Sequence, residues 1–242
     1  MAKFKNIVLN IPHSSINGIF GEYGKWSPNP YFMKDCVAKL TDWYTDILFG
    51  TKNEKVKSVI FPYSRYVCDA ERLVDDPMEA EGQGIIYTHY GGYTRGALTE
   101  DERKHILSLR TEHLDRLTEA LEDDASLIID CHSFNGENND CDIRIGYNND
   151  ETCDDETLLL VKQTFRKYNY SVALNDPYAN SIAPSTDKRF KSIMIEVNKK
   201  LYLYNDNQLC GDKFHWMRWY GCLNRIYEGL LIWQVGLKSR QI

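Results

Sequence analysis

The sequence predicts an α/β fold in which one mixed or mostly parallel sheet lies between two layers of helices. Short apolar runs rich in β-branched residues alternate with longer amphipathic stretches along the 242 residues. No internal repeat, low-complexity segment or Pro/Gly/Ser-rich linker interrupts this alternation, and the length suits one large domain. We therefore expect a single three-layer α/β/α domain over residues 1–242.

Five apolar runs are predicted to form the sheet. They span residues 6–11, 56–61, 127–130, 143–147 and 192–197. Each is short, bounded by polar or turn-forming residues, and rich in the side chains that favour buried strands.

Four stretches with helical spacing of apolar residues separate or follow these strands. They span residues 30–50, 99–122, 154–168 and 206–235. The second begins with Thr99 and Glu102, which have the spacing of a capping box and can satisfy each other's backbone amides.

Charge and composition argue against several classes of protein. The formal net charge is −6 and the isoelectric point is near 5.6, which disfavours a nucleic-acid partner. No stretch approaches the roughly 20 apolar residues that cross a bilayer, and the N-terminus lacks the features of a secretory signal. The seven cysteines form no CxxC pair. We expect a cytoplasmic protein with reduced thiols and neither a nucleic-acid nor a membrane partner.

Two histidines and a glutamate mark the candidate site. His13 and His132 each come shortly after a predicted strand, and Glu196 lies within another. In α/β sheets the loops at the carboxyl ends of strands converge, so these side chains are expected to meet. Two imidazoles and one carboxylate suit a catalytic zinc ion, and a second carboxylate can act as general base. The alternative is that both histidines are ordinary hydrogen-bonded turn residues.

The residue pattern leaves the third metal ligand open. The candidates are Asp42, Asp46, Asp69 and Glu71.

Arginines near these residues predict recognition of a carboxylate. Arg65 and Arg72 flank Asp69 after the second strand, and guanidinium groups bind carboxylates in a bidentate manner. A surface ion pair is the competing interpretation. Arg144 alternates with apolar residues in the fourth strand and can direct its guanidinium into the pocket.

Six motifs together resemble the N-formylglutamate amidohydrolase (deformylase) family. They are PHSS (12–15), TDW (41–43), SRYVCDAER (64–72), IDCHSF (129–134), GYN (146–148) and IEVNKKLY (195–202). The resemblance extends from about residue 6 to residue 203. It implies an α/β sheet flanked by helices, of the phosphorylase/hydrolase-like and zinc-exopeptidase-like kind, related to zinc carboxypeptidases and deacylases.

The same resemblance implies roles for individual residues. His13, Asp42 and His132 match the positions expected to bind the metal ion, for which Zn²⁺ is our expectation. Glu196 matches the expected general base.

The substrate-binding segment matches the family less closely. Arg65, Asp69 and Arg72 occupy the positions expected to recognise substrate. Glu71 replaces an asparagine of the usual Asp-Leu-Asn-Arg motif, and it can either bind the metal itself or disfavour a dianionic substrate. The glycine-rich Gly-Gly-x-Ile-Thr-Arg stretch is changed to YANSIAP at residues 178–184.

These observations predict a metal-dependent amidohydrolase that cleaves a small carboxylate-bearing N-acyl amino acid, such as N-formylglutamate. The alternatives are an amidase for peptide-like or cell-wall-derived amides and a non-catalytic ligand-binding relative. The aromatic-rich C-terminal helix suggests a homodimer.

Overall fold

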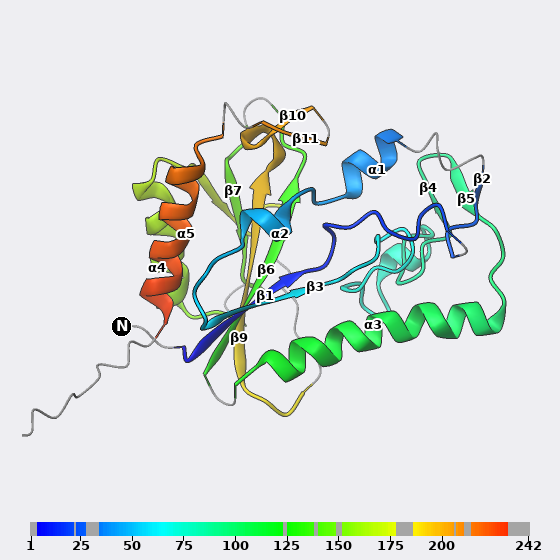
Figure 1. Ribbon diagram of the computed structural model, residues 1–242, viewed down its shortest axis with the longest axis horizontal. Coiled ribbons are helices and arrows are strands. Elements are labelled where there is room, and N and C mark those ends of the chain that lie inside the picture. The colour runs from blue at the N-terminus through cyan, green and yellow to red at the C-terminus, as the bar shows by residue number, and fades with distance from the viewer. Residues whose placement is uncertain are drawn as a thin grey trace, which may run out of the picture.

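A computed structural model describes nine segments of the chain. They are residues 4–21, 23–27, 34–122, 125–137, 140–148, 152–177, 186–205, 207–210 and 214–231. Figure 1 shows a central twisted sheet with α3 along one side and α4 and α5 packed on the other.

The central sheet is mixed, and its six strands run in the order β3-β1-β6-β9-β7-β8. Their bounds are β1 Asn6–Ile11, β3 Val56–Ile60, β6 Ser126–Phe134, β7 Ile143–Gly146, β8 Val172–Leu174 and β9 Phe190–Asn198. Strands β3, β1, β6 and β9 pair in parallel, whereas β7 is antiparallel to β9 and parallel to β8. The predicted α/β class and mixed sheet are confirmed.

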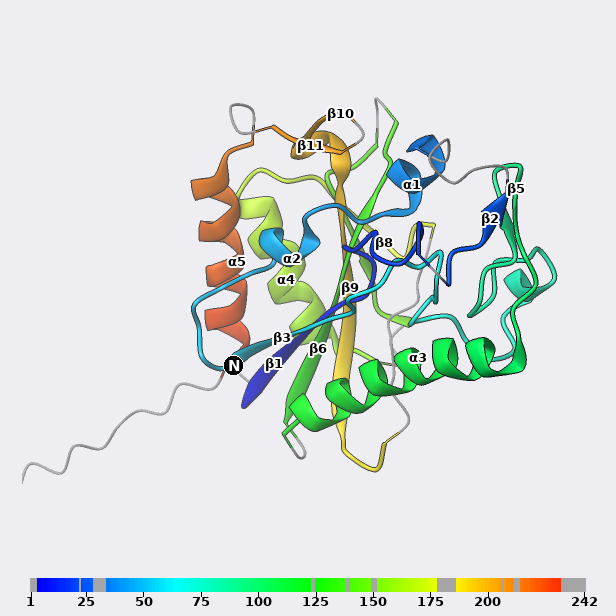
Figure 2. The ribbon, with the colours of Figure 1, turned by 45° about the vertical axis from the view of Figure 1, so that its right-hand side comes forward.

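Alternation along the strands divides the core between two helical layers. On β1, Ile7 and Leu9 belong to a core cluster shared with Phe165 of α4 (Asp155–Lys167) and Trp219 of α5 (Trp216–Leu230). Val8 instead packs in a cluster with residues of α3 (Glu100–Ala120). Successive side chains of a strand point to opposite faces, so even-numbered residues of β1 face α3 (Figure 2).

Two strands are longer than predicted, and this changes the position of the candidate histidine. Strands β6 and β9 each contain nine residues. His132 therefore lies inside β6 rather than in the loop after it, and it is the register partner of Glu196 on β9. The polar residues at 130–133 stay in the strand because they continue the ladder with β9.

Residues 30–50 were predicted to form one continuous helix, and this prediction is wrong. Residues 34–40 form α1 (Lys34–Leu40) and residues 45–48 form α2 (Thr45–Leu48), while residues 30–33 lie outside the described part of the chain. Between the two helices, the amide of Asp42 donates to the carbonyl of His13 at 2.9 Å, and Tyr44 has a left-handed φ of 62°. Tertiary contacts thus break the amphipathic pattern at Asp42.

The other helices agree with prediction at their centres. Thr99 and Glu102 form the predicted capping box at the start of α3. The predicted helix 206–235 is reduced to α5, and a hairpin of β10 (Leu203–Asn205) and β11 (Gln208–Leu209) precedes it. Residues 206, 211–213 and 232–235 lie outside the described segments.

The small elements were not predicted. They are a three-stranded sheet of β2 (Trp26–Ser27), β5 (Tyr93–Arg95) and β4 (His89–Tyr90), and the 3₁₀ turns η2 (Pro77–Glu79) and η4 (Lys199–Leu201). Among the described residues, none of the helices has the length and apolar character needed to span a membrane.

Candidate metal centre

Polar side chains replace apolar ones on the α3-facing side of the sheet, toward the carboxyl ends of its parallel strands. Asn10 on β1 is the register partner of Asp130 on β6, and His132 is the partner of Glu196 on β9. Arg144 on β7 lies opposite Glu196 from the other side. The alternation of each strand therefore brings these five side chains to one face of the sheet.

Asp69 connects the first histidine to two arginines. Its Oδ1 lies 2.9 Å from Nε2 of His13, and its Oδ2 accepts from Arg65 at 3.1 Å. Arg72 approaches the same Oδ2 at 3.4 Å and donates to the hydroxyl of Tyr87 at 3.2 Å. Asp69 is 1% exposed, so this carboxylate is buried and neutralised by the groups around it.

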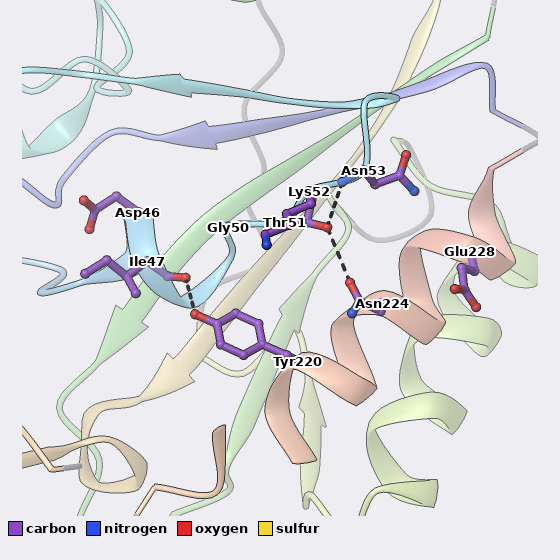
Figure 3. A pocket seen from close by; sticks show the side chains of 9 residues that line it. All are labelled: Asp46, Ile47, Gly50, Thr51, Lys52, Asn53, Tyr220, Asn224 and Glu228. Carbon is purple, nitrogen blue, oxygen red and sulfur yellow. Dashed lines mark hydrogen bonds between the residues drawn. The ribbon is translucent and has the colours of Figure 1, made fainter. Parts of the chain in front are cut away.

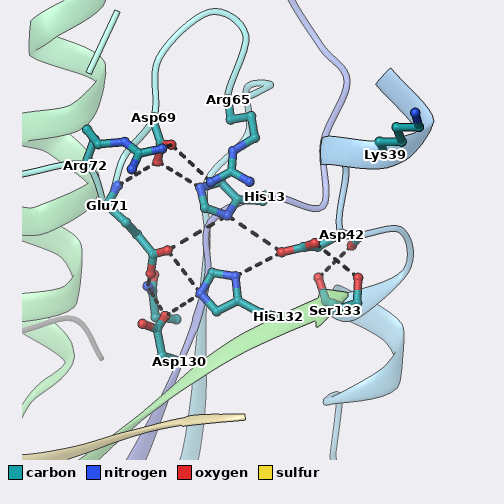
Figure 4. A network of polar contacts seen from close by, with 12 residues as sticks. His13, Lys39, Asp42, Arg65, Asp69, Glu71, Arg72, Asp130, His132 and Ser133 are labelled. Atoms are coloured by element: carbon teal, nitrogen blue, oxygen red, sulfur yellow. Dashed lines mark hydrogen bonds and ion pairs between the residues drawn. The ribbon is translucent and has the colours of Figure 1, made fainter. Parts of the chain in front are cut away.

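His132 has carboxylates at both ring nitrogens, one at Nδ1 and two at Nε2 (Figure 4). Its Nδ1 is 2.9 Å from Oδ2 of Asp42, whose Oδ1 accepts from the Ser133 hydroxyl at 3.1 Å. Its Nε2 is 3.0 Å from Oε2 of Glu71 and 3.4 Å from Oδ1 of Asp130. The non-helical segment between α1 and α2 allows Asp42 to reach this ring.

His13 presents a buried nitrogen that lacks a hydrogen-bond partner among the described residues. This Nδ1 lies 3.7 Å from Oδ2 of Asp42 and 3.8 Å from Oε2 of Glu71. The centroids of the His13 and His132 rings are 5.2 Å apart. Ligand atoms of His13, Glu71 and His132 all lie within 4.8 Å of one another, so this buried group could hold a metal ion.

The two carboxylates beside the histidines differ in their acidity. Burial alone would raise the pKa of Asp42, but the neighbouring His13 and the hydrogen bond to His132 hold that pKa well below its usual range. Burial and the nearby Asp130 charge instead raise the pKa of Glu71 to about 7. Near neutral pH, Asp42 is therefore ionised, whereas Glu71 is more easily protonated.

Glu196 is a buried acid whose Oε2 lacks a hydrogen-bond partner among the described residues. Burial raises the pKa of Glu196, and the neighbouring His132 partly opposes this shift. The guanidinium carbon of Arg144 lies 3.8 Å from the centroid of the Phe134 ring, and Arg144 also pairs with Asp140 at 3.1 Å. A raised pKa and a free oxygen suit a group that exchanges protons with a ligand.

Comparison with known proteins identifies the family of this chain. The sequence profile of the N-formylglutamate amidohydrolase family matches residues 6–203. The chain belongs to this family. A search of curated protein sequences found no match.

Solved structures support the same fold. N-formylglutamate amidohydrolase from Ralstonia eutropha JMP134 is 18% identical with a TM-score of 0.70, and the match covers 95% of this chain and 93% of that chain. A gene product from Agrobacterium tumefaciens is 17% identical with a TM-score of 0.62, covering 94% of this chain and 90% of that one. The α/β architecture of this amidohydrolase family member therefore has experimentally determined counterparts.

The fold gathers most of the residues that the sequence singled out. His13, Asp42, Asp69, Glu71 and His132 form one contact network. Asp46, the remaining candidate for the third ligand, is exposed on α2. The altered loop at 178–184 lies outside the described residues.

Sequence reasoning missed Asn10 and Asp130, which also belong to this network. Asn10 Nδ2 donates to Glu71 at 2.6 Å and to Asp130 at 2.7 Å. Both residues occupy even positions in otherwise apolar strands, on the α3 face. A polar residue at such a position was the available signal, because an unpaired buried polar group is costly.

A groove of about 570 Å³ lies away from this cluster, beside α5 on the opposite face of the sheet (Figure 3). Lys52, Asn53, Tyr220 and Glu228 are among its lining residues. None of the clustered histidines or carboxylates lines it, so it is not part of the candidate metal centre.

Proposed function

We propose that this family member is a metal-dependent amidohydrolase that cleaves the amide of a small N-acyl amino acid. The observation that carries the proposal is the buried, unpartnered Nδ1 of His13, which faces two carboxylates beside a second histidine. An unpaired buried nitrogen in such a setting needs a partner, and imidazole with carboxylate is the donor set that zinc prefers.

We assign the metal ligands as Nδ1 of His13, Oδ2 of Asp42 and Nδ1 of His132. In this arrangement Asp69 and Glu71 hold the Nε2 atoms of the two rings, at 2.9 and 3.0 Å. Histidine ligands commonly donate their second N–H to a carboxylate in this way. The group of His13, Glu71 and His132 is the competing set, with Asp42 holding the Nδ1 proton of His132.

We prefer the first set because His13, Asp42 and His132 are the residues that match the metal-binding positions implied by the resemblance to the family. Glu196 lies beside either set, since it is the register partner of His132.

The proposed chemistry follows from the residues around the assigned metal ligands. A bound zinc ion supplies Lewis-acid activation of water and of the amide carbonyl. Glu196 accepts a proton from the attacking water through its free Oε2, and it returns that proton to the leaving amine as the C–N bond breaks. Burial of Glu196 matches its proton affinity to this exchange.

The substrate is proposed to carry a carboxylate, as N-formylglutamate does. The name of the family supports the formyl amino acid as the first compound to test. We assign the substrate carboxylate to Arg144, because Arg144 is the register partner of the proposed base Glu196, whereas Arg65 and Arg72 contact the buried Asp69. We assign Arg65, Asp69 and Arg72 to the wall of the substrate site, where the two arginines give this wall a net positive charge.

The test combines metal content with a substrate panel. Purified wild-type protein and His132→Ala are compared by elemental analysis, and each is assayed against N-formylglutamate, N-acetyl amino acids and peptidyl amides. About one zinc per chain, lost in the variant, together with hydrolysis of formyl amino acids supports the proposal. Preferred cleavage of peptidyl amides would identify a peptide amidase. Metal binding without any hydrolysis would identify a binding protein.

A further inference from the structure

We propose that Asn10 and His113 form a buried positioning pair for the candidate metal centre. The Asn10 amide holds the carboxylates of Glu71 and Asp130 beside His132, and His113 fixes the direction of that amide. This inference rests on the proposed function, because the centre that it stabilises is the one assigned above.

The contacts form a continuous chain from α3 to the centre. Nε2 of His113 lies 2.8 Å from Oδ1 of Asn10. Nδ2 of Asn10 then donates to Oε1 of Glu71 at 2.6 Å and to Oδ1 of Asp130 at 2.7 Å. The other oxygen of Glu71 lies 3.0 Å from Nε2 of His132. Asn10 and His113 are both 0% exposed, so water does not compete for these bonds.

The neighbours of Asn10 determine which way its amide points. Oxygens of Glu71 and Asp130 lie 2.6 and 2.7 Å from the same Asn10 atom, and only an NH₂ group can donate to both of them. The reverse orientation would place Oδ1 against both carboxylates and leave the NH₂ group facing His113. The amide oxygen must therefore face His113, which has to supply a proton.

His113 is suited to supply that proton as a neutral ring. Its Nδ1 has no hydrogen-bond partner among the described residues, and its ring packs edge-on against Phe61 with centroids 5.3 Å apart. Burial lowers the pKa of His113 to about 3. The ring consequently carries its single proton on Nε2, and Asn10 Oδ1 accepts it.

The pair acts at a distance from the metal ligands. The Asn10 amide holds the two like-charged carboxylates of Glu71 and Asp130 in place beside His132. The orientation of the His132 ring toward the metal is thereby fixed. Loss of such an outer contact commonly weakens metal binding by about 10- to 100-fold. Asn10 and His113 touch neither metal nor substrate in this proposal, so they are positioning residues.

A measurement on the metal-free protein tests the orientation directly. Long-range ¹H–¹⁵N correlation spectra of the full chain report the tautomer of each histidine ring. We expect His113 to be neutral with its proton on Nε2 at pH 7. A proton on Nδ1 alone would reverse the Asn10 amide and overturn the proposal.

Variants of His113 test the consequence for the centre. His113→Gln keeps an N–H donor near the position of Nε2, whereas His113→Phe keeps the ring shape without a donor. Leu117→Ala is the matched control, because Leu117 is one helical turn further along α3, is 0% exposed and packs in an apolar cluster. Zinc affinity is measured by competition with a chromogenic chelator, and the ¹⁵N resonances of His132 are recorded without metal.

We expect His113→Phe to weaken zinc binding by about 10-fold or more, and His113→Gln to stay within about threefold of wild type. The Nε2 resonance of His132 should move in His113→Phe and stay in place in Leu117→Ala. Wild-type zinc affinity and an unchanged His132 resonance in folded His113→Phe would overturn the proposal. If His113→Phe does not fold, the wild-type tautomer still decides. If wild-type protein binds no zinc, the proposed function fails, and the His132 resonance still decides the positioning role.

Discussion

His132 on β6 and Glu196 on β9 are register partners in neighbouring parallel strands, so the two side chains leave the same face of the sheet. Arg144 on β7 is the partner of Glu196 from the antiparallel side. Three strands therefore place an imidazole, a carboxylate and a guanidinium in one row. The backbone of such a row is rigid, because moving one of its Cα positions along the strand requires slipping the whole strand. This rigidity suits a site in which a base must stay at a fixed distance from the metal ligands.

Replacing the proposed base separates catalysis from metal binding. Glu196→Gln is nearly isosteric but cannot accept a proton, so kcat for N-formylglutamate should fall by about 10²- to 10⁴-fold while zinc content stays at the wild-type level. Steady-state kinetics and elemental analysis on the same preparation measure both. Glu54→Gln, at an exposed position, is the control. Wild-type kcat in Glu196→Gln would remove Glu196 from the mechanism.

Two carboxylate variants distinguish the competing ligand sets. Asp42→Asn should weaken zinc binding by about 100-fold or more, because it removes a ligand, whereas Glu71→Gln should cost about 10-fold through the second nitrogen of His132. Both substitutions preserve side-chain shape, so chelator competition compares them directly. The opposite ranking would assign the ligand role to Glu71 and the orienting role to Asp42.

Arg144 should affect substrate binding more than turnover. A charge-assisted hydrogen bond contributes about 1.5–3 kcal/mol, so Arg144→Gln is expected to raise KM for N-formylglutamate by about 10-fold or more. The control is Arg218→Gln, since Arg218 also stacks on an aromatic ring, Tyr170, but belongs to α5 on the opposite face. If KM stays at the wild-type value in Arg144→Gln, the substrate carboxylate binds elsewhere.

Acidification should destabilise the protein through His113. Burial lowers its folded-state pKa from 6.5 to about 3, so the unfolded chain binds the extra proton at intermediate pH. Stability from this group is fully present above pH 6.5 and is lost as pH falls toward 3. Between pH 7.5 and 5.5 the expected loss is about 1.4 kcal/mol. Urea unfolding of wild type and His113→Gln at both pH values isolates this contribution. Equal losses in the two proteins would contradict the assignment.

Local chemistry made much of the fold predictable. The five strand cores and the capping box of Thr99 and Glu102 were identified from residues close together in sequence. The ends of elements were not, because they depend on distant partners. Strand β6 continues through His132 since β9 pairs with it, and the helix over residues 30–50 breaks at Asp42 since His13 and His132 bind that residue.

The sequence by itself determined the α/β class, the family motifs and the two histidines, because each is encoded in short-range pattern and residue type. Only the tertiary structure decided which carboxylates meet those histidines. The residue pattern alone did not rank Asp42, Asp69 and Glu71 as ligands, and the family resemblance favoured Asp42; in the fold, each approaches a different set of ring nitrogens. Asn10 and His113 are 103 positions apart in the chain, and they are in contact only because α3 packs on β1. Contacts of that separation depend on packing, which local sequence does not specify.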